Sequence, residues 1–563
     1  MQTESPLSAR WRNAAVFMLV LLAVFSMHLA INRIFQVDEC QNVYMSRIVA
    51  LHETGTYFTN GTLFILGPMS WIAAHTSSSA MIYTWDRLLF LGVFWGNLVL
   101  IALNTGVPLR SRAFLLVLLG AGTLAPLWDY GFEIRHDNVL LLLLLGMWWV
   151  VRRARWRPEA AFALLGALSV LAQCVSFKAF LYWLPLSLAA LLVPPASLRA
   201  PRGRRLLWWV LGAAGAGLLA SAAYGATGTL GSFLNGFRTS VGHSENPDRF
   251  APWTTLGRLP AQMPLVTAMA AGLLVAAGLR IGKTRLAALT WEGPLPEAAL
   301  LLGSLAILLI NPVPYPYNLV LLVPFAFLAA FQWVPTLGRL LGTDGMPALA
   351  GSVLVFTHLV PFAVQTARHL DFTNDRQEQL MDLAESLTDP AKDRVYDGAG
   401  LVATRESIHY QWFLHSLVMP KIASGQLPPV RDMIAANPPS VILASYRTDW
   451  LSPEDQTYIT QHYVPLADDF YVLGASLPEG GGSFECLHPG RYQIALQAQV
   501  TGPGALPQVD GRPADGPVEL AAGLHRITVP VGVKAAVIWL GPHLAGLRLP
   551  SAADHRALFV NWY

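Results

Sequence analysis

Two adjacent carboxylates, Asp38 and Glu39, follow the first long apolar run of the sequence, residues 14–31. Lipid penalises charge, so an acidic pair where a helix leaves the membrane is either solvated or functional. A carboxylate here could take the proton of a hydroxyl group, as the transfer of a sugar to an alcohol acceptor requires. A loop at this depth also suits a donor whose phosphate is carried on a lipid.

A second polar segment, residues 133–138, leads into another apolar run and contains Arg135 and Asp137. The guanidinium of Arg135 offers a planar fork of donors that suits a phosphate. Asp137 could orient Arg135 or bind a sugar hydroxyl. The alternative is an Arg–Asp pair that only caps a helix at the membrane interface.

Three further side chains occupy the ends of apolar runs, namely Arg87, Lys178 and Tyr317. Arg87 begins the second run, Lys178 separates two runs, and Tyr317 precedes a run that contains a proline. A lone ammonium or guanidinium at membrane depth suits a lipid phosphate, whereas interfacial anchoring is the alternative for all three side chains.

The composition indicates a polytopic membrane protein with soluble parts. Of the 563 residues, 54% are hydrophobic and only 13% are charged, whereas soluble domains carry about 25% charged residues. The net charge of +3 comes from short basic clusters between apolar runs. Such clusters report membrane topology rather than nucleic-acid binding.

Candidate membrane spans follow one another through most of the chain, and several are short for a straight crossing. The predicted spans are 14–31, 81–103, 113–127, 139–151, 160–176, 179–193, 206–223, 263–279, 298–310, 319–334 and 347–364. A further apolar stretch, 63–74, is interrupted by Gly67-Pro68 and predicts a helix lying at the interface. Every second loop is basic, which predicts a cytoplasmic N-terminus and an extracytoplasmic region after residue 366.

The polar remainder predicts two extracytoplasmic units, 367–478 and 483–563, after a membrane domain of residues 1–366. The first should be an α/β unit with strands at 394–396 and 440–444 and helices at 406–419, 428–437 and 453–462. Gly480-Gly481-Gly482 predicts a linker. The second unit has alternating strands at 491–496, 525–529 and 535–540, which is typical of a β-sandwich.

The arrangement of these motifs resembles the GT-C glycosyltransferases, in particular the branch with protein O-mannosyltransferases and lipid A aminoarabinose transferases. The resemblance covers roughly residues 14–335. It implies that Asp38 is the catalytic base and Glu39 its structural or assisting neighbour, and it supports substrate-binding roles for Arg87, Arg135, Asp137, Lys178 and Tyr317. Relatives usually carry a basic residue before the tyrosine, where this chain has Pro316, so this loop is a weaker candidate for phosphate binding.

The sequence therefore predicts a helical GT-C membrane protein of about 11 spans that transfers a hexose or pentose with inversion. Its donor would be a polyprenyl-phosphate monosaccharide, and its acceptor a lipid, polysaccharide or protein outside the bacterial cytoplasmic membrane. No cofactor is indicated, and a divalent metal is possible but has no evident ligand set. Alternatives are a flippase for lipid-linked sugars, which predicts charges buried at mid-span, and a non-catalytic glycan-binding scaffold.

Overall fold

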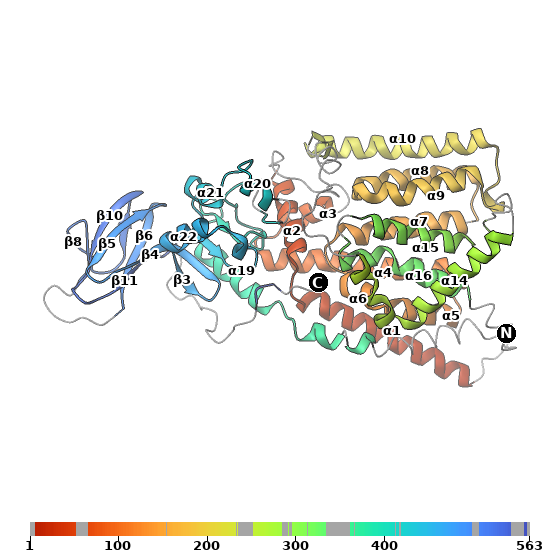
Figure 1. Cartoon of the computed structure of the whole chain (residues 1–563), viewed down its shortest axis with the longest axis horizontal. Coiled ribbons are helices and arrows are strands. Elements are labelled where there is room, and N and C mark those ends of the chain that lie inside the picture. The colour runs from red at the N-terminus through yellow and green to blue at the C-terminus, as the bar shows by residue number, and fades with distance from the viewer. Residues whose placement is uncertain are drawn as a thin grey trace.

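A bundle of helices forms one end of the molecule and two β-sheets form the other (Figure 1). The structure, a computed structural model, describes residues 6–51, 66–153, 155–231, 233–234, 252–283, 291, 295–311, 314–333, 361–364, 366–410, 413–415, 418–497, 506–541 and 557–559.

The helices that form the body of the bundle lie side by side (Figure 1). They include α1 (Pro6–Asn32), α4 (Ser79–Asn104), α7 (His136–Arg152), α8 (Pro158–Val175), α9 (Phe180–Leu192), α10 (Arg202–Ala226), α14 (Pro264–Lys283) and α15 (Leu295–Ile310). The same region also contains α2 (Val37–Ala50), α3 (Leu66–Ala74), α5 (Arg112–Gly122), α6 (Ala125–Tyr130), α12 (Pro252–Leu256), α13 (Arg258–Gln262), α16 (Val323–Phe331) and the 3-10 turns η1 (Phe177–Ala179), η2 (Ala196–Leu198) and η4 (Pro316–Leu321).

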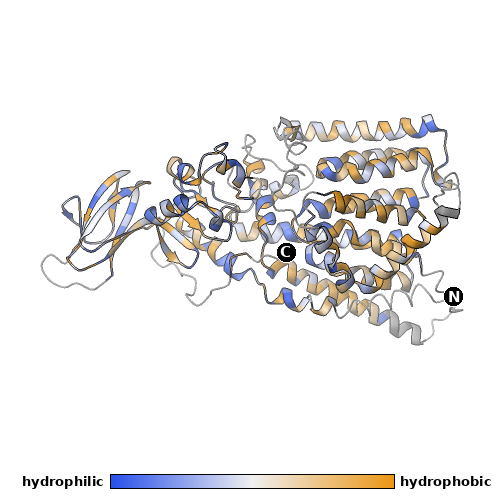
Figure 2. Cartoon of the chain, in the orientation of Figure 1, coloured by the Kyte–Doolittle hydropathy of each residue, from blue (hydrophilic) through white to orange (hydrophobic). Residues whose placement is uncertain are grey.

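Four described helices are long and apolar enough to cross a membrane, namely 13–32 of α1, α4, α8 and α10. A fifth crossing is possible if α12 to α14, bent by 115°, form one span, and shorter apolar helices occur at 113–122, 177–192, 295–310 and 316–331. Apolar residues dominate the bundle (Figure 2). The predicted span 113–127 breaks after Gly122, span 319–334 begins as a 3-10 turn, and most of 347–364 lies outside the described residues.

The basic clusters gather at one end of the bundle. Arg152 pairs with Glu297 at 2.8 Å, Arg153 donates to the carbonyl of Asn104 at 3.0 Å, and Arg204 pairs with Glu159. The first two contacts join the end of α7 to the start of α15 and the end of α4, and the third joins the starts of α8 and α10. The two sheets lie at the opposite end (Figure 1).

The C-terminal region contains a seven-stranded sheet and a four-stranded sheet. The larger has the order β1-β2-β4-β11-β6-β9, with β3 also paired to β4, and the smaller has the order β5-β10-β7-β8. The strands are β1 (Val395–Tyr396), β2 (Val441–Leu443), β3 (Tyr463–Ala467), β4 (Phe470–Leu477), β5 (Gly481–Cys486), β6 (Gly490–Leu496), β7 (Gln508–Val509), β8 (Arg512–Pro513), β9 (Val518–Leu520), β10 (Gly523–Thr528) and β11 (Ala535–Trp539). Helices α19 (Asp375–Leu387), α20 (Met419–Ala423), α21 (Val430–Ala436), η5 (Thr448–Trp450) and α22 (Pro453–His462) surround the first strands.

Two local predictions for this region were wrong, and one helix was missed. Gly481 and Gly482 belong to β5 and pair with β10, so they are not a linker. Of the predicted helix 406–419, the described residues 406–410, 413–415 and 418 are not helical, and residue 419 begins α20. Helix α19 was not predicted. The division into units at 478 and 483 stays a prediction, since β4 pairs with β2 at one end and with β11 at the other.

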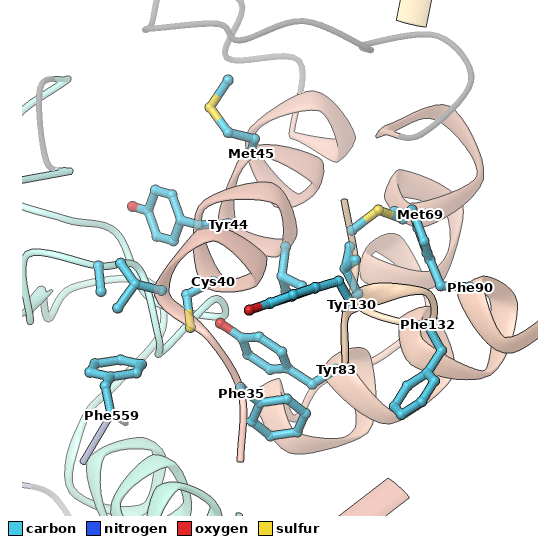
Figure 3. Packing of buried hydrophobic residues seen from close by; sticks show 14 of the residues in the cluster. Phe35, Cys40, Tyr44, Met45, Met69, Tyr83, Phe90, Tyr130, Phe132 and Phe559 are labelled. Atoms are coloured by element: carbon cyan, nitrogen blue, oxygen red, sulfur yellow. The ribbon is translucent and has the colours of Figure 1, made fainter. Parts of the chain in front are cut away.

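The parallel strands β1 and β2 end at the edge of the sheet that faces the bundle. Their carboxyl ends share one edge, and the loop after β1 contacts the start of α4. There the hydroxyl of Tyr83 donates to the carbonyl of Gly400 at 3.2 Å, and the backbone N–H of Thr404 donates to Ser79 Oγ at 3.2 Å. Figure 3 shows Phe559, from the C-terminal segment, close to Phe35 and Cys40. One buried hydrophobic cluster therefore continues from the bundle into the sheets.

Candidate active site

The acidic pair begins a short helix rather than lying in a loop as predicted. Asp38 and Glu39 occupy the first turn of α2, and the Glu39 carboxylate accepts a hydrogen bond from the backbone N–H of Gln36 at 2.9 Å. Negative charge is favourable at the start of a helix. The two side chains have different surroundings, since 34% of the Asp38 side chain is exposed and none of the Glu39 side chain is.

Glu39 forms a buried ion pair with Arg87. The Arg87 Nε donates to Glu39 Oε1 at 2.9 Å and its Nη2 to Oε2 at 2.6 Å, while the remaining contacts go to the carbonyls of Arg33 and Ile34. Burial raises the pKa of Glu39, but the charge and hydrogen bonds of Arg87 outweigh burial and leave the pKa lowered. Because these contacts occupy both of its terminal nitrogens, this placement does not support the predicted contact between Arg87 and substrate.

Arg135 contacts Asp38 directly. Its Nη1 donates to Asp38 Oδ2 at 2.7 Å. The backbone of the preceding residue fixes this contact, because the Ile134 N–H donates to Glu39 Oε1 at 3.1 Å and the Ile134 carbonyl accepts from Asn42 at 2.9 Å. Both partners of Ile134 belong to α2. The buried Glu39 therefore helps to position the arginine that contacts the exposed Asp38.

Cations keep Asp38 ionised. Burial raises the pKa of Asp38, but the Arg135 charge, then the Arg447 charge and the Arg135 hydrogen bond, leave it below the usual value. Asp38 is thus an accessible carboxylate that pairs with Arg135 of the bundle and is also stabilised by the charge of Arg447 in the C-terminal region.

Lys178 extends the polar cluster from the other side of α7. Its Nζ lies 2.6 Å from Asp137 Oδ1 and donates to Asn318 Oδ1 at 2.9 Å. Asp137 is almost fully buried and lies 4.0 Å from Arg135 Nε, so it joins the two cations. The Arg135 guanidinium lies over the Tyr317 ring, 3.6 Å from its centroid.

The structure thus brings Asp38, Arg135, Asp137, Lys178 and Tyr317 into one chain of contacts, and places Glu39 and Arg87 beneath it. Sequence reasoning missed a second buried pair, Arg33 with Glu133 at 3.1 Å. It also missed His369, whose Nε2 lies 2.8 Å from Asp129 Oδ1. A basic residue directly after an apolar run was the only available signal for Arg33.

Three residues of the C-terminal region, Arg447, Tyr446 and His415, interact electrostatically with Asp38. The charge of Asp38 acts on the pKa values of both Tyr446 and His415. Burial lowers the pKa of His415 to about 4, so this histidine is neutral near pH 7. Nothing in the sequence pattern indicated these residues, because they follow Asp38 by more than 370 positions. Within the described ranges, no three His, Cys, Asp or Glu side chains are grouped as metal ligands.

The bundle with its terminal sheets has the same overall fold as two solved structures, as the predicted resemblance implies at the level of the fold. Two crystal structures of ArnT from Cupriavidus metallidurans, a lipid A aminoarabinose transferase, are similar to this chain. The one bound to undecaprenyl phosphate has a TM-score of 0.52 at 13% identity, and the apo structure has 0.53 at 14%. Both comparisons cover 82% of this chain and 98% of ArnT. No family model and no curated protein matches the sequence.

Proposed function

We propose that this protein is an integral-membrane glycosyltransferase that moves a monosaccharide from a polyprenyl phosphate to a hydroxyl acceptor. The observation that carries the proposal is the accessible carboxylate of Asp38, 2.7 Å from a guanidinium and at the polar end of an apolar bundle. The fold shared with ArnT, which was crystallised with undecaprenyl phosphate, supports the same class of donor.

In this proposal Asp38 is the general base. Its carboxylate takes the proton of the acceptor hydroxyl, and the acceptor oxygen attacks the anomeric carbon. The bond from that carbon to the phosphate oxygen breaks, and its electron pair leaves with the lipid phosphate. Attack from the face opposite the phosphate inverts the configuration of the sugar.

The leaving phosphate gains negative charge as this bond breaks, so fixed cations near it would accelerate the reaction. Lys178 and Arg135 are our candidates for these cations. Lys178 uses two of its three N–H groups on Asp137 and Asn318, and its side chain is 25% exposed. Asp137 and Tyr317 would hold the two cations in place. We assign Glu39 and Arg87 to the positioning of Ile134 and Arg135.

The membrane orientation belongs to the same proposal. The end of the bundle that contacts the sheets would face the extracytoplasmic side of the bacterial inner membrane, where no nucleotide sugar is available. The basic end formed by Arg152, Arg153 and Arg204 would face the cytoplasm, as the positive-inside rule requires.

Asp38→Asn in the full-length protein tests the proposal. The substitution keeps the shape of the side chain but removes the base, and we expect transfer from labelled lipid-linked sugar in membranes to fall about 100-fold or more. Asp515→Asn, at an exposed position among the strands, is the matched control and should transfer at the wild-type rate. Turnover of Asp38→Asn within a few-fold of wild type would remove Asp38 as the base. Movement of lipid-linked sugar across vesicles without transfer would instead support a flippase.

A further inference from the structure

The loops that follow the parallel strands β1 and β2 lie at the edge of the larger sheet that faces the bundle, where a ligand could bind. Ligands of open α/β sheets commonly lie at the carboxyl ends of parallel strands. After β1, the Asp397 carboxylate accepts hydrogen bonds from four consecutive backbone N–H groups, those of residues 399 to 402. The loop after β2 contains Tyr446 and Arg447. Both loops lie on the side of the sheet that contacts the bundle.

Hydrogen bonds and an aromatic ring fix the position of the Arg447 side chain at this edge of the sheet. Its Nη1 donates to the carbonyl of Leu414 at 2.8 Å and its Nε to the Tyr446 hydroxyl at 3.2 Å. Its guanidinium lies over the Trp450 ring, 4.4 Å from the centroid. Leu414 is in turn fixed by its N–H, which donates to the carbonyl of Gly398 at 2.8 Å.

A glycine is required beneath Arg447. Gly398 has a φ of +66°, and a Cβ there would lie 2.9 Å from the side chain of Leu414 and 3.6 Å from that of Arg447. The turn therefore brings the 413–415 segment and the arginine together.

In the described part of the chain, Arg447 is a half-buried cation with no carboxylate at ion-pair distance, although its charge also acts on Asp38. Among the residues that the structure describes, no ion pair involves it, and its Nη2 makes no hydrogen bond to protein. Other half-buried or buried arginines near the site are paired, as Arg87 is with Glu39 and Arg135 with Asp38. Placing a charge in a partly dry environment is costly unless an opposite charge compensates it. The unused donors thus suit an anion supplied by a ligand.

We propose that Arg447 binds an anionic group, a phosphate or a carboxylate, on the acceptor, and so selects acceptors of that class. The inference rests on the proposed function. In an inverting displacement the acceptor and the leaving phosphate approach opposite faces of the sugar. Arg135 and Lys178 are assigned to the leaving phosphate, which leaves Arg447, the cation held at the sheet edge by Leu414 and Trp450, for the acceptor. The aromatic rings of Tyr446 and Trp450 would contact the body of the acceptor beside its charge.

Acceptor fractions from cell envelopes provide the test. An envelope extract is separated by anion exchange into neutral and anionic fractions, and each is incubated with full-length protein and labelled undecaprenyl-phosphate sugar. One anionic portion is treated with phosphatase and another with a carbodiimide that neutralises carboxylates. We expect label in the anionic fraction only. Loss of label after phosphatase would identify a phosphate, and loss after carbodiimide would identify a carboxylate.

Arg447→Gln should raise the acceptor KM by about 10-fold or more, because a hydrogen-bonded charge is lost. The donor KM should change much less than the acceptor KM. In wild-type protein, the slow transfer of sugar to water needs no acceptor and reports the transferase activity separately. Arg447→Lys keeps the charge and should recover part of the acceptor affinity. Arg512→Gln, at an exposed strand position, is the matched control.

Label in the neutral fraction, or an unchanged acceptor KM in Arg447→Gln, would overturn this inference while leaving the transferase assignment intact. If wild-type protein transferred sugar neither to a fraction nor to water, the proposed function itself would fail. Equal thermal unfolding of Arg447→Gln and wild type separates loss of binding from loss of folding. If Arg447→Gln unfolds at a lower temperature than wild type, the acceptor KM of Arg447→Lys is compared with that of wild type instead.

Discussion

At the scale of single residues, the decisive contrast is between two neighbours. Asp38 and Glu39 are adjacent and chemically similar, yet only the Asp38 side chain is exposed, by 34%. Each carboxylate has an arginine partner, but the partner of Glu39 is fully buried. A proton acceptor must reach its substrate, so exposure rather than charge distinguishes the candidate base.

The lowered pKa of Asp38 predicts the acid limb of the pH profile. A base whose pKa lies below its usual value stays ionised until the pH falls through that lowered pKa. The acid limb of kcat/KM should therefore lie below about pH 4, where an ordinary aspartate titrates. Arg135→Gln removes the largest opposing charge, so the limb should move to higher pH, and the shift is measured from rates at a series of pH values.

The position of this limb, not the absolute rate, is the quantity to compare, because Arg135 is also a candidate phosphate ligand. Recovery of full rate after return to pH 7 controls for unfolding in acid. A limb at the same pH in both proteins would contradict an electrostatic effect of Arg135 on Asp38.

At the scale of elements, the buried pair Glu39–Arg87 joins α2 to α4. Glu39→Gln would leave the Arg87 charge buried without compensation, so we expect a loss of about 3–5 kcal/mol in the free energy of unfolding. Thermal and denaturant unfolding in detergent measure the change. Asp432→Asn, in the exposed pair Arg431–Asp432, is the control and should change stability by less than about 1 kcal/mol.

Removing both charges separates the two roles of this pair. Glu39→Gln with Arg87→Met should recover much of the lost stability, because no buried charge remains unpaired. A single Glu39→Gln variant as stable as wild type would show that the pair does not hold the two helices together.

At the scale of the whole molecule, one buried amide joins three distant segments. The Gln377 side chain of α19 accepts from the N–H of Phe35 at 2.6 Å and donates to the carbonyls of Phe35 and Leu558 at 3.0 and 2.8 Å. Gln377→Leu leaves these buried groups unpaired, each at a cost of about 1–3 kcal/mol. Hydrogen exchange should therefore become faster at residue 35 and in α19.

Gln461→Leu, at an exposed position, provides the matched control and should leave hydrogen exchange unchanged at both places. Wild-type protection in Gln377→Leu would mean that apolar packing alone fixes the C-terminal region on the bundle.

The sequence was sufficient for the elements with strong local patterns. Apolar runs, the Asp510-Gly511 turn between β7 and β8, and helix α22 at 453–462 follow from periodicity and turn chemistry. It also yielded Asp38, Arg135 and Lys178, because charge is rare beside lipid. It did not indicate Arg447, whose role depends on a contact between segments far apart in the chain. Apart from the family resemblance, the residue pattern did not separate Asp38 from Glu39, because exposure depends on tertiary packing.

Strand β4 has a practical implication for anyone trimming this protein. Residues 474–477 pair with β11, and residues 470–472 of the same strand pair with β2. A truncated protein that ends near residue 478 would lack β11, so residues 474–477 of β4 would have unpaired backbone N–H and C=O groups. Such an exposed strand edge can pair with other chains. We expect this truncated protein to aggregate, whereas a protein that extends through β11 keeps the backbone of residues 474–477 paired.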